Sequence, residues 1–164
     1  MAYTVYTVAG AQPITTHSTV QKHPLGAIVR GVDPTYGEAE FIYLLGVAST
    51  AVGSVVTYDA STYQTVLSAV GGSIPRPIAI AMSANVASEY GWYQISGVAV
   101  VKKTCTVSLA AGAAVGVLTT GLIAGTASLK EIFGAVVAAV ASATAGRTTV
   151  KVMINRPHKQ GRIT

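Results

Sequence analysis

The sequence predicts an all-β protein, a single β-barrel or jelly-roll-like sandwich with an extended N-terminal arm and a short basic C-terminal tail. Three observations predict this fold. Apolar and polar residues alternate with a period of two far more often than with the helical period of 3.6. β-Branched and aromatic residues gather in short runs separated by turn formers. The length of 164 residues suits one domain with a substantial core.

The chain divides into three predicted parts. Residues 1–35 form the arm, because Pro13 and Pro24 interrupt any regular element there. Residues 36–155 form the β-domain. Residues 156–164 form the basic tail, for which we expect irregular structure.

The first half of the β-domain reads as an antiparallel meander. Turn formers at 33–37 precede the first strand, a turn at 59–61 separates two others, and the Gly- and Pro-containing stretch 71–77 is a clear break. Small residues alternate in the strand after this break, which implies a tightly packed neighbour. The expected strands are residues 40–47, 54–58, 63–67 and 78–82.

The second half begins with the strongest strand signal of the chain, residues 91–101. Trp92 is expected to fill one face of the core there, with Tyr93 on the opposite face. A helix over 129–143 competes with a strand in that region, because alanine-rich sequence has high helix propensity. The remaining expected strands are residues 104–109, 114–119, 132–141 and 147–155, the last two joined by a hairpin connection at 142–146.

Charge is scarce in this chain. Charged residues make up 10% of it, against about 25% in an ordinary soluble domain, and hydrophobic residues make up 51%. A freely soluble monomer needs a charged surface, so this composition predicts a surface largely covered by other chains. Cys105 is the only cysteine, which excludes an intramolecular disulfide and a cysteine-based zinc site, and fits a reducing compartment.

Membrane and export signals are weak. The N-terminus has neither the basic region nor the apolar region of a secretory signal. Residues 104–129 carry no charge and have membrane-type glycine spacing, but so many Gly, Ser and Thr residues are a poor match to a lipid-facing helix. We therefore expect no membrane partner.

No catalytic motif stands out, and we predict that the protein is not an enzyme and uses no cofactor or metal. His17, His23 and His158 lack metal-ligand spacing. Glu38 and Glu40 share one face of a strand, but with no partner histidine they are interpreted as edge charges or as an intermolecular salt bridge. The basic tail lacks aromatic residues, so direct nucleic-acid binding is not expected.

These considerations leave a set of polar and aromatic residues, in the arm, at the start of the β-domain and in the tail, as the candidate contacts to a partner. They are Tyr3, Tyr6, His17, Glu38, Glu40, Arg156, Lys159 and Arg162.

Four segments carry a resemblance to a known family. They are GAIVRG at 26–31, YGEAEFIYL at 36–44, GSVVTYD at 53–59 and YGWYQISG at 90–97. Together with the Ala/Gly/Val/Thr-rich strands and a final hairpin, they make residues 25–157 similar to the capsid decoration, or cement, proteins of tailed bacteriophages. The resemblance implies a β-barrel or sandwich on the outer shell, often a trimer, that locks neighbouring major-capsid subunits together.

The resemblance thus predicts a homotrimer that is made in the bacterial host cytoplasm, binds the phage major capsid protein and resides on the capsid exterior. Two alternatives stay open. The chain is another virion component, such as a tail-tube, head-fibre base or minor capsid protein. Or it is a carbohydrate- or host-binding β-module, which would need an exposed aromatic platform around Trp92.

Overall fold

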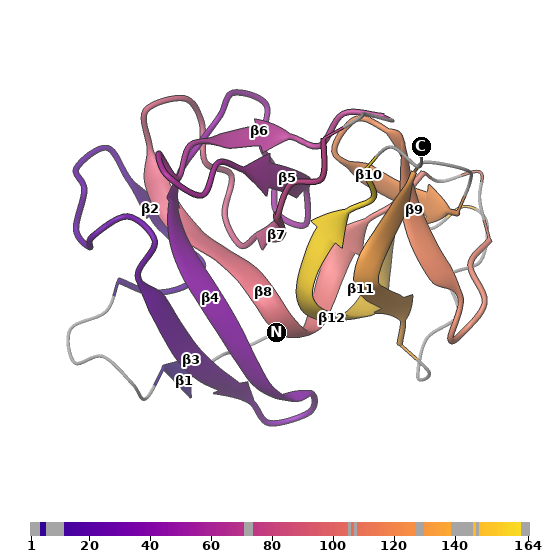
Figure 1. Ribbon diagram of the computed structural model, residues 1–164. Helices are drawn as coiled ribbons and strands as arrows, with labels where there is room; N and C mark the ends of the chain where they lie inside the picture. Colours follow the sequence, from indigo (N-terminus) through magenta and orange to yellow (C-terminus); the bar gives the residue numbers. More distant parts are fainter. Residues whose placement is uncertain are drawn as a thin grey trace.

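The computed structural model is all-β, as predicted: its described residues contain no helix and form one curled antiparallel sheet shaped as a half-barrel (Figure 1). The described residues are 4–5, 12–70, 74–104, 106, 108–126, 130–138, 146 and 148–161. The strands of the first half are β1 (Thr4–Val5), β2 (His17–Ser18), β3 (Ile28–Asp33), β4 (Gly37–Leu45), β5 (Val55–Tyr58), β6 (Thr65–Leu67) and β7 (Ile78–Ala81). Those of the second half are β8 (Tyr90–Lys102), β9 (Ala114–Thr119), β10 (Leu122–Gly125), β11 (Glu131–Val137) and β12 (Thr149–Lys159).

The long strand β8 is the central strand of the sheet. Its N-terminal half pairs with β4, as in Ile42 opposite Tyr93, and its C-terminal half pairs with β12, as in Val152 opposite Ala99. The main hydrogen-bonded order is β1-β3-β4-β8-β12-β11-β9-β10. Strands β2 and β7 also pair with β8, and β5 joins β6 to β7.

Gly97 marks the point where β8 passes from one neighbour to the other. Its φ is +93°, and a Cβ added there would lie 2.6 Å from the Glu38 carbonyl oxygen and 2.9 Å from the Ala39 Cβ. No other residue type fits this place without a shift of the backbone. The change of neighbour along β8, from β4 to β12, therefore requires glycine at this position.

The N-terminal half of β8 is buried on both faces. On one face Trp92 packs with Phe41 and Tyr43. On the other face Tyr93 packs with Val56 and other residues of β5 and β7. Trp92 and Tyr93, which the alternation placed on opposite faces, are thus both core residues. The prediction that Trp92 fills one face of the core is confirmed.

The C-terminal half of β8 belongs to a separate core. Val101, Val117 and Ile154 are among the apolar residues that β8 to β12 direct into it. The outer strand β10 returns to the end of β8, where the Thr104 backbone N–H donates to the Ile123 carbonyl at 3.0 Å. This return gives the right-hand half of Figure 1 its curled shape.

The segment 12–33 corrects the prediction that residues 1–35 form an arm outside the β-domain. Strand β3 pairs with β4 along its whole length. Ile14 is buried, and Trp92 Nε1 donates to the Gln12 carbonyl at 3.0 Å. The prolines do interrupt regular structure here, but an irregular segment can still cover a core.

The end of β12 corrects the predicted tail. Residues 156–159 belong to the strand, and β11 supplies partners for the last two of them, with Phe133 opposite His158 and Ile132 opposite Lys159. Lys159 is only 6% exposed, and its Nζ donates to the Ala69 carbonyl at 2.7 Å.

Strands β4 to β9, β11 and β12 overlap the predicted positions, whereas β3 and β10 were not predicted as strands. Residues 104, 106 and 108 lie outside strands, so the strand expected at 104–109 is wrong for them. Glu131–Val137 is a strand, so the helix alternative is wrong over that range. Of the predicted hairpin connection, only Gly146 lies within the described residues. The described part of the chain includes no helix with the length and apolarity that a membrane crossing needs.

Candidate functional site

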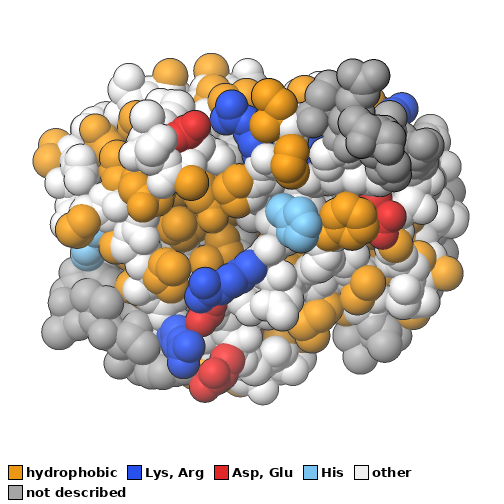
Figure 2. All heavy atoms as spheres, viewed as in Figure 1, with side chains coloured by type: hydrophobic (Ala, Val, Ile, Leu, Met, Phe, Trp, Pro, Cys, Tyr) orange, Lys and Arg blue, Asp and Glu red, His pale blue; other side chains and the backbone are white. Residues whose placement is uncertain are grey.

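One face of the molecule carries an apolar hollow of about 300 Å³, which we call the groove. Four isoleucines from four strands form its apolar lining: Ile28 of β3, Ile42 of β4, Ile78 of β7 and Ile95 of β8. Figure 2 shows apolar side chains gathered in this hollow, with basic and acidic side chains along its lower border and a histidine beside it.

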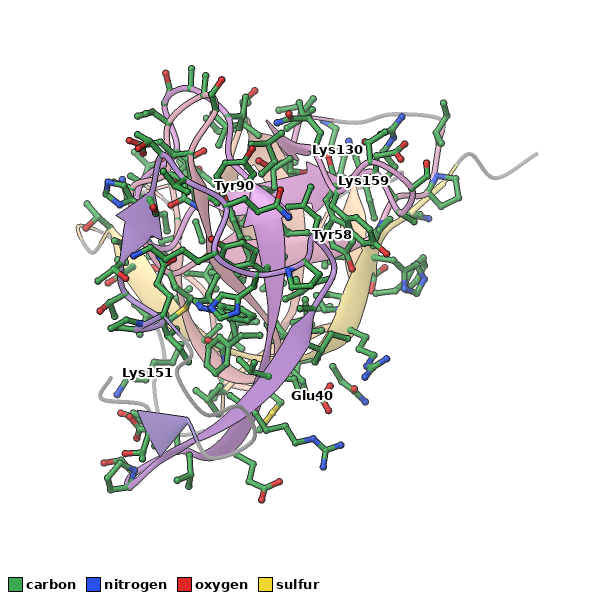
Figure 3. The ribbon with its side chains drawn as sticks, turned by 90° about the vertical axis from the view of Figure 1, so that its left-hand side faces the viewer. Glu40, Tyr58, Tyr90, Lys130, Lys151 and Lys159 are labelled. Atoms are coloured by element: carbon green, nitrogen blue, oxygen red, sulfur yellow. The ribbon has the colours of Figure 1, made fainter. Side chains whose placement is uncertain are left out.

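Prolines and polar side chains complete the groove. Pro75, Pro77 and Pro157 contribute to its walls, and Tyr58, Arg76, Arg156 and His158 contribute its polar groups. Figure 3 shows Tyr58 and Glu40 on the side of the molecule that carries the groove, with Lys159 above them, whereas Lys151 lies on the opposite side.

The polar border of the groove is organised by Glu40. Its Oε2 accepts from Arg156 Nη2 at 3.0 Å, and its Oε1 accepts from Arg30 Nε at 3.1 Å. Arg30 reaches Glu40 because β3 and β4 place the two residues directly opposite each other. Arg156 arrives from β12, so this carboxylate links three strands.

Arg156 owes its position to an irregularity in the sheet. The register between β11 and β12 shifts between Phe133 and Ala135, and Gly134 between them has φ +77°. Arg156 itself has φ +43°, which is uncommon for a residue with a side chain. β-Bulges of this kind re-aim side chains, and here the guanidinium reaches the groove and Glu40.

Charge also acts on the groups beside the groove. Burial raises the pKa of Tyr58, and the Arg156 charge acts in the opposite direction. Arg76 also lines the groove, and its Nη1 lies 3.9 Å from Asp59 Oδ2. Hydrogen bonds from Ser61 and Thr62 hold the pKa of Asp59 well below its ordinary value.

A second, polar hollow of about 290 Å³ adjoins the groove and shares Arg156 with it. Three of the residues predicted from sequence as partner contacts, Glu38, Glu40 and Arg156, line this hollow together. The alternation had placed both glutamates on one face of a strand, and the structure agrees. Glu40 has partners on both β3 and β8 and pairs with arginines of its own chain, so the interpretation as an edge charge or an intermolecular salt bridge is wrong for it. Glu38 is paired with Val32 of β3, and for it the interpretation stays a prediction.

The other predicted contact residues lie elsewhere. His17 belongs to β2, and its Nε2 is 3.5 Å from Glu89 Oε2. Lys159 is buried, as described above. Tyr3, Tyr6 and Arg162 lie outside the described residues, as does Cys105.

Most of the groove was not predicted from the sequence. Ile28 stood in the predicted arm, and Arg76 stood in a stretch interpreted only as a break between strands. The signal present was the Pro-Arg-Pro sequence at 75–77. That signal indicates a rigid, strand-free wall, but not what the wall faces.

Trp92 cannot serve as an exposed aromatic platform, because its exposed fraction is 0%. Its ring centroid lies 5.0 Å from that of Tyr43 and 5.2 Å from that of His23. Within the ranges that the structure describes, no three His, Cys, Asp or Glu side chains gather into a metal site. No protein-family model matches the chain, and no curated protein matches it.

Proposed function

We propose that the protein is a structural virion protein that binds the outer surface of a tailed-bacteriophage capsid and stabilises it by bridging neighbouring major-capsid subunits. The proposal combines the resemblance of residues 25–157 to capsid decoration proteins with the character of the surface. Its action is entirely noncovalent, and repeated copies supply the strength of attachment.

The apolar character of the exposed surface is the observation that carries the proposal. Among the described residues, eleven large apolar side chains are exposed, in a chain with only 10% charged residues. They are Val20, Ile28, Val32, Val52, Val66, Val70, Ile74, Val86, Phe133, Val136 and Met153. Such a surface favours contact with other chains over free solution.

The groove and the adjoining polar hollow give this surface a natural contact site. An apolar floor bordered by charged groups is the arrangement common at protein interfaces, where a dry centre is surrounded by a polar rim. We propose that one capsid subunit is engaged here and that other exposed apolar residues engage a neighbouring subunit.

The test is the location and copy number of the protein in particles of the phage that encodes it. We expect mass spectrometry of purified particles to find the chain in numbers comparable to the major capsid protein. Electron microscopy should place its density outside the shell, and particles lacking the gene should lose heat resistance. Absence of the chain from purified particles would refute the proposal.

The alternatives predict different outcomes of the same experiment. A tail-tube protein would appear along the tail, and a head-fibre base or minor capsid protein would be present in far fewer copies. The alternative of a carbohydrate-binding module is no longer supported by an exposed aromatic platform, because Trp92 is buried.

A further inference from the structure

We infer that the groove is a docking site for an extended acidic peptide segment. One or two apolar side chains of the segment insert into the groove, and the carboxylates on either side of them contact the arginines at its border. The inference rests on the proposed function for the identity of the protein that carries the segment. The chemistry of the site is argued from the groove itself.

The size and floor of the groove define the inserted part. A volume of about 300 Å³ lies at the lower end of the roughly 300–1,000 Å³ found for ligand pockets. It accommodates side chains rather than a folded element. Ile42, Ile78 and Ile95 are buried, whereas Ile28 is 43% exposed at the border, so an inserted apolar side chain meets apolar surface.

The walls disfavour recognition by strand addition. Pro75, Pro77 and Pro157 have no backbone N–H to donate to an added strand. Two nearby carbonyls are already occupied: Arg76 accepts from the Lys159 N–H at 2.9 Å, and Pro77 accepts from the Tyr58 N–H at 3.2 Å. Recognition by side chains is therefore favoured.

The charged groups that line the groove favour an acidic segment. Arg76 and Arg156 are permanent cations, and none of the described residues that line the groove is a carboxylate. The nearby anions, Glu40 and Asp59, lie outside the groove and each faces an arginine. The Arg156 side chain is 64% exposed, and its guanidinium has five N–H donors, of which Nη2 contacts Glu40. Donors thus remain for an incoming carboxylate.

An array of nonapeptides tests this inference without any capsid. Each peptide carries a central pair of leucine, isoleucine or phenylalanine residues, flanked on both sides by aspartate, serine or lysine. We expect binding of the full-length protein to aspartate-flanked peptides, and at least about tenfold weaker binding to their lysine-flanked counterparts. Replacing the central pair by serine should abolish binding.

Two pairs of variants locate the binding. Ile28→Asn should abolish it, whereas Val32→Asn should not, because Val32 is an exposed apolar residue four positions further along the same face of β3 and lies outside the groove. Arg156→Gln should weaken it about tenfold, whereas Arg30→Gln, which removes the other ion pair of Glu40, should leave it within twofold. Thermal melts confirm that each variant is folded.

Failure of every peptide to bind would overturn the inference, as would a preference for lysine flanks or equal effects within each variant pair. These outcomes are separate from the fate of the proposed function. Peptide binding by a protein that is absent from virions would refute the virion role and leave the docking site standing.

Discussion

Arg156 shows how much of the candidate site depends on single residues. It borders both hollows, links β12 to Glu40 on β4, and has a positive φ that costs free energy in an isolated chain. Sequence analysis marked Arg156 as a contact residue, but as part of an irregular tail. A register shift between β11 and β12 directs its side chain to the groove, and no local sequence pattern reveals this shift.

Trp92 offers a direct test of the core at the residue scale. We expect Trp92→Ala to lower the free energy of unfolding by about 3–5 kcal/mol, because a large buried ring leaves a cavity and the Gln12 carbonyl loses its donor. Urea unfolding measures this loss. As the only tryptophan, Trp92 should also give blue-shifted emission protected from quenchers; freely quenched, red-shifted emission would contradict the structure.

Asp59 provides a pH-dependent prediction. Its Oδ1 accepts hydrogen bonds from the Ser61 hydroxyl and from the Ser61 and Thr62 N–H groups, and these lower its pKa below the ordinary 3.8. The contribution of Asp59 to stability is therefore present above about pH 4 and is lost as the pH falls through the folded-state pKa.

Nuclear magnetic resonance titration of the Asp59 carboxyl carbon measures this pKa. The Ser61 hydroxyl is the largest cause of the shift, and the Thr62 side chain is the smallest of the groups that lower it. Ser61→Ala should therefore raise the pKa towards its ordinary value by more than Thr62→Ala does. Equal effects, or a wild-type pKa at the ordinary value, would contradict the described turn.

At the scale of elements, the mostly irregular segment 12–27 covers one face of the core. Ile14, Leu25 and Ala27 pack on the face of β4 and β8 that holds Trp92. Because this segment has no strand period, sequence analysis assigned it to a detached arm. Burial by an irregular segment depends on contacts between residues far apart in sequence, such as the Trp92 indole and the Gln12 carbonyl, and a single sequence does not encode such pairs locally.

Substitutions in the segment 12–27 distinguish it from an arm. Ile14→Ala should lower the free energy of unfolding by about 2–4 kcal/mol, because Ile14 is buried in the Trp92 cluster. Val20→Ala, at a position that is 67% exposed, is the matched control and should change it by less than about 0.5 kcal/mol. Both values come from urea unfolding of the full chain, and an arm would give two equally small effects.

The strands themselves were largely predictable, and the two longest exceptions, β3 and β10, have different causes. Alternation and β-branched residues located β4 to β9 because those strands combine strong local preference with tertiary pairing. Strand β10, only Leu122–Gly125, depends on its pairing with β9 and on its return to the end of β8. Strand β3 alternates in burial along its length, but the prolines before it had assigned it to the arm.

At the scale of the whole molecule, one long strand contributes to three cores, and the groove lies where residues from two of them come together. Ile42 and Ile95 of the groove belong to the core around Tyr93, whereas Ile78 belongs to the core of β9 to β12. The site therefore exists only in the complete fold. The two glutamates of the adjoining hollow and Arg156, which lines both hollows, were predicted from the sequence as contact residues, but their position beside the isoleucines was not.

The scarcity of charge leads to a prediction about assembly. We expect the isolated protein to be a homotrimer, with three times the 16.7 kDa mass of the chain, in sedimentation velocity and light scattering at micromolar concentration. Val136 and Met153 are partners on β11 and β12 and are 42% and 46% exposed, so we propose them as part of the expected contact between subunits. Met153→Asp would bury an unpaired charge in that contact and should yield monomers, whereas Val20→Asp, on a bend far along the chain, should leave the mass unchanged. A monomeric wild-type protein would contradict the assembly, and a trimeric Met153→Asp variant would show that another surface holds it together.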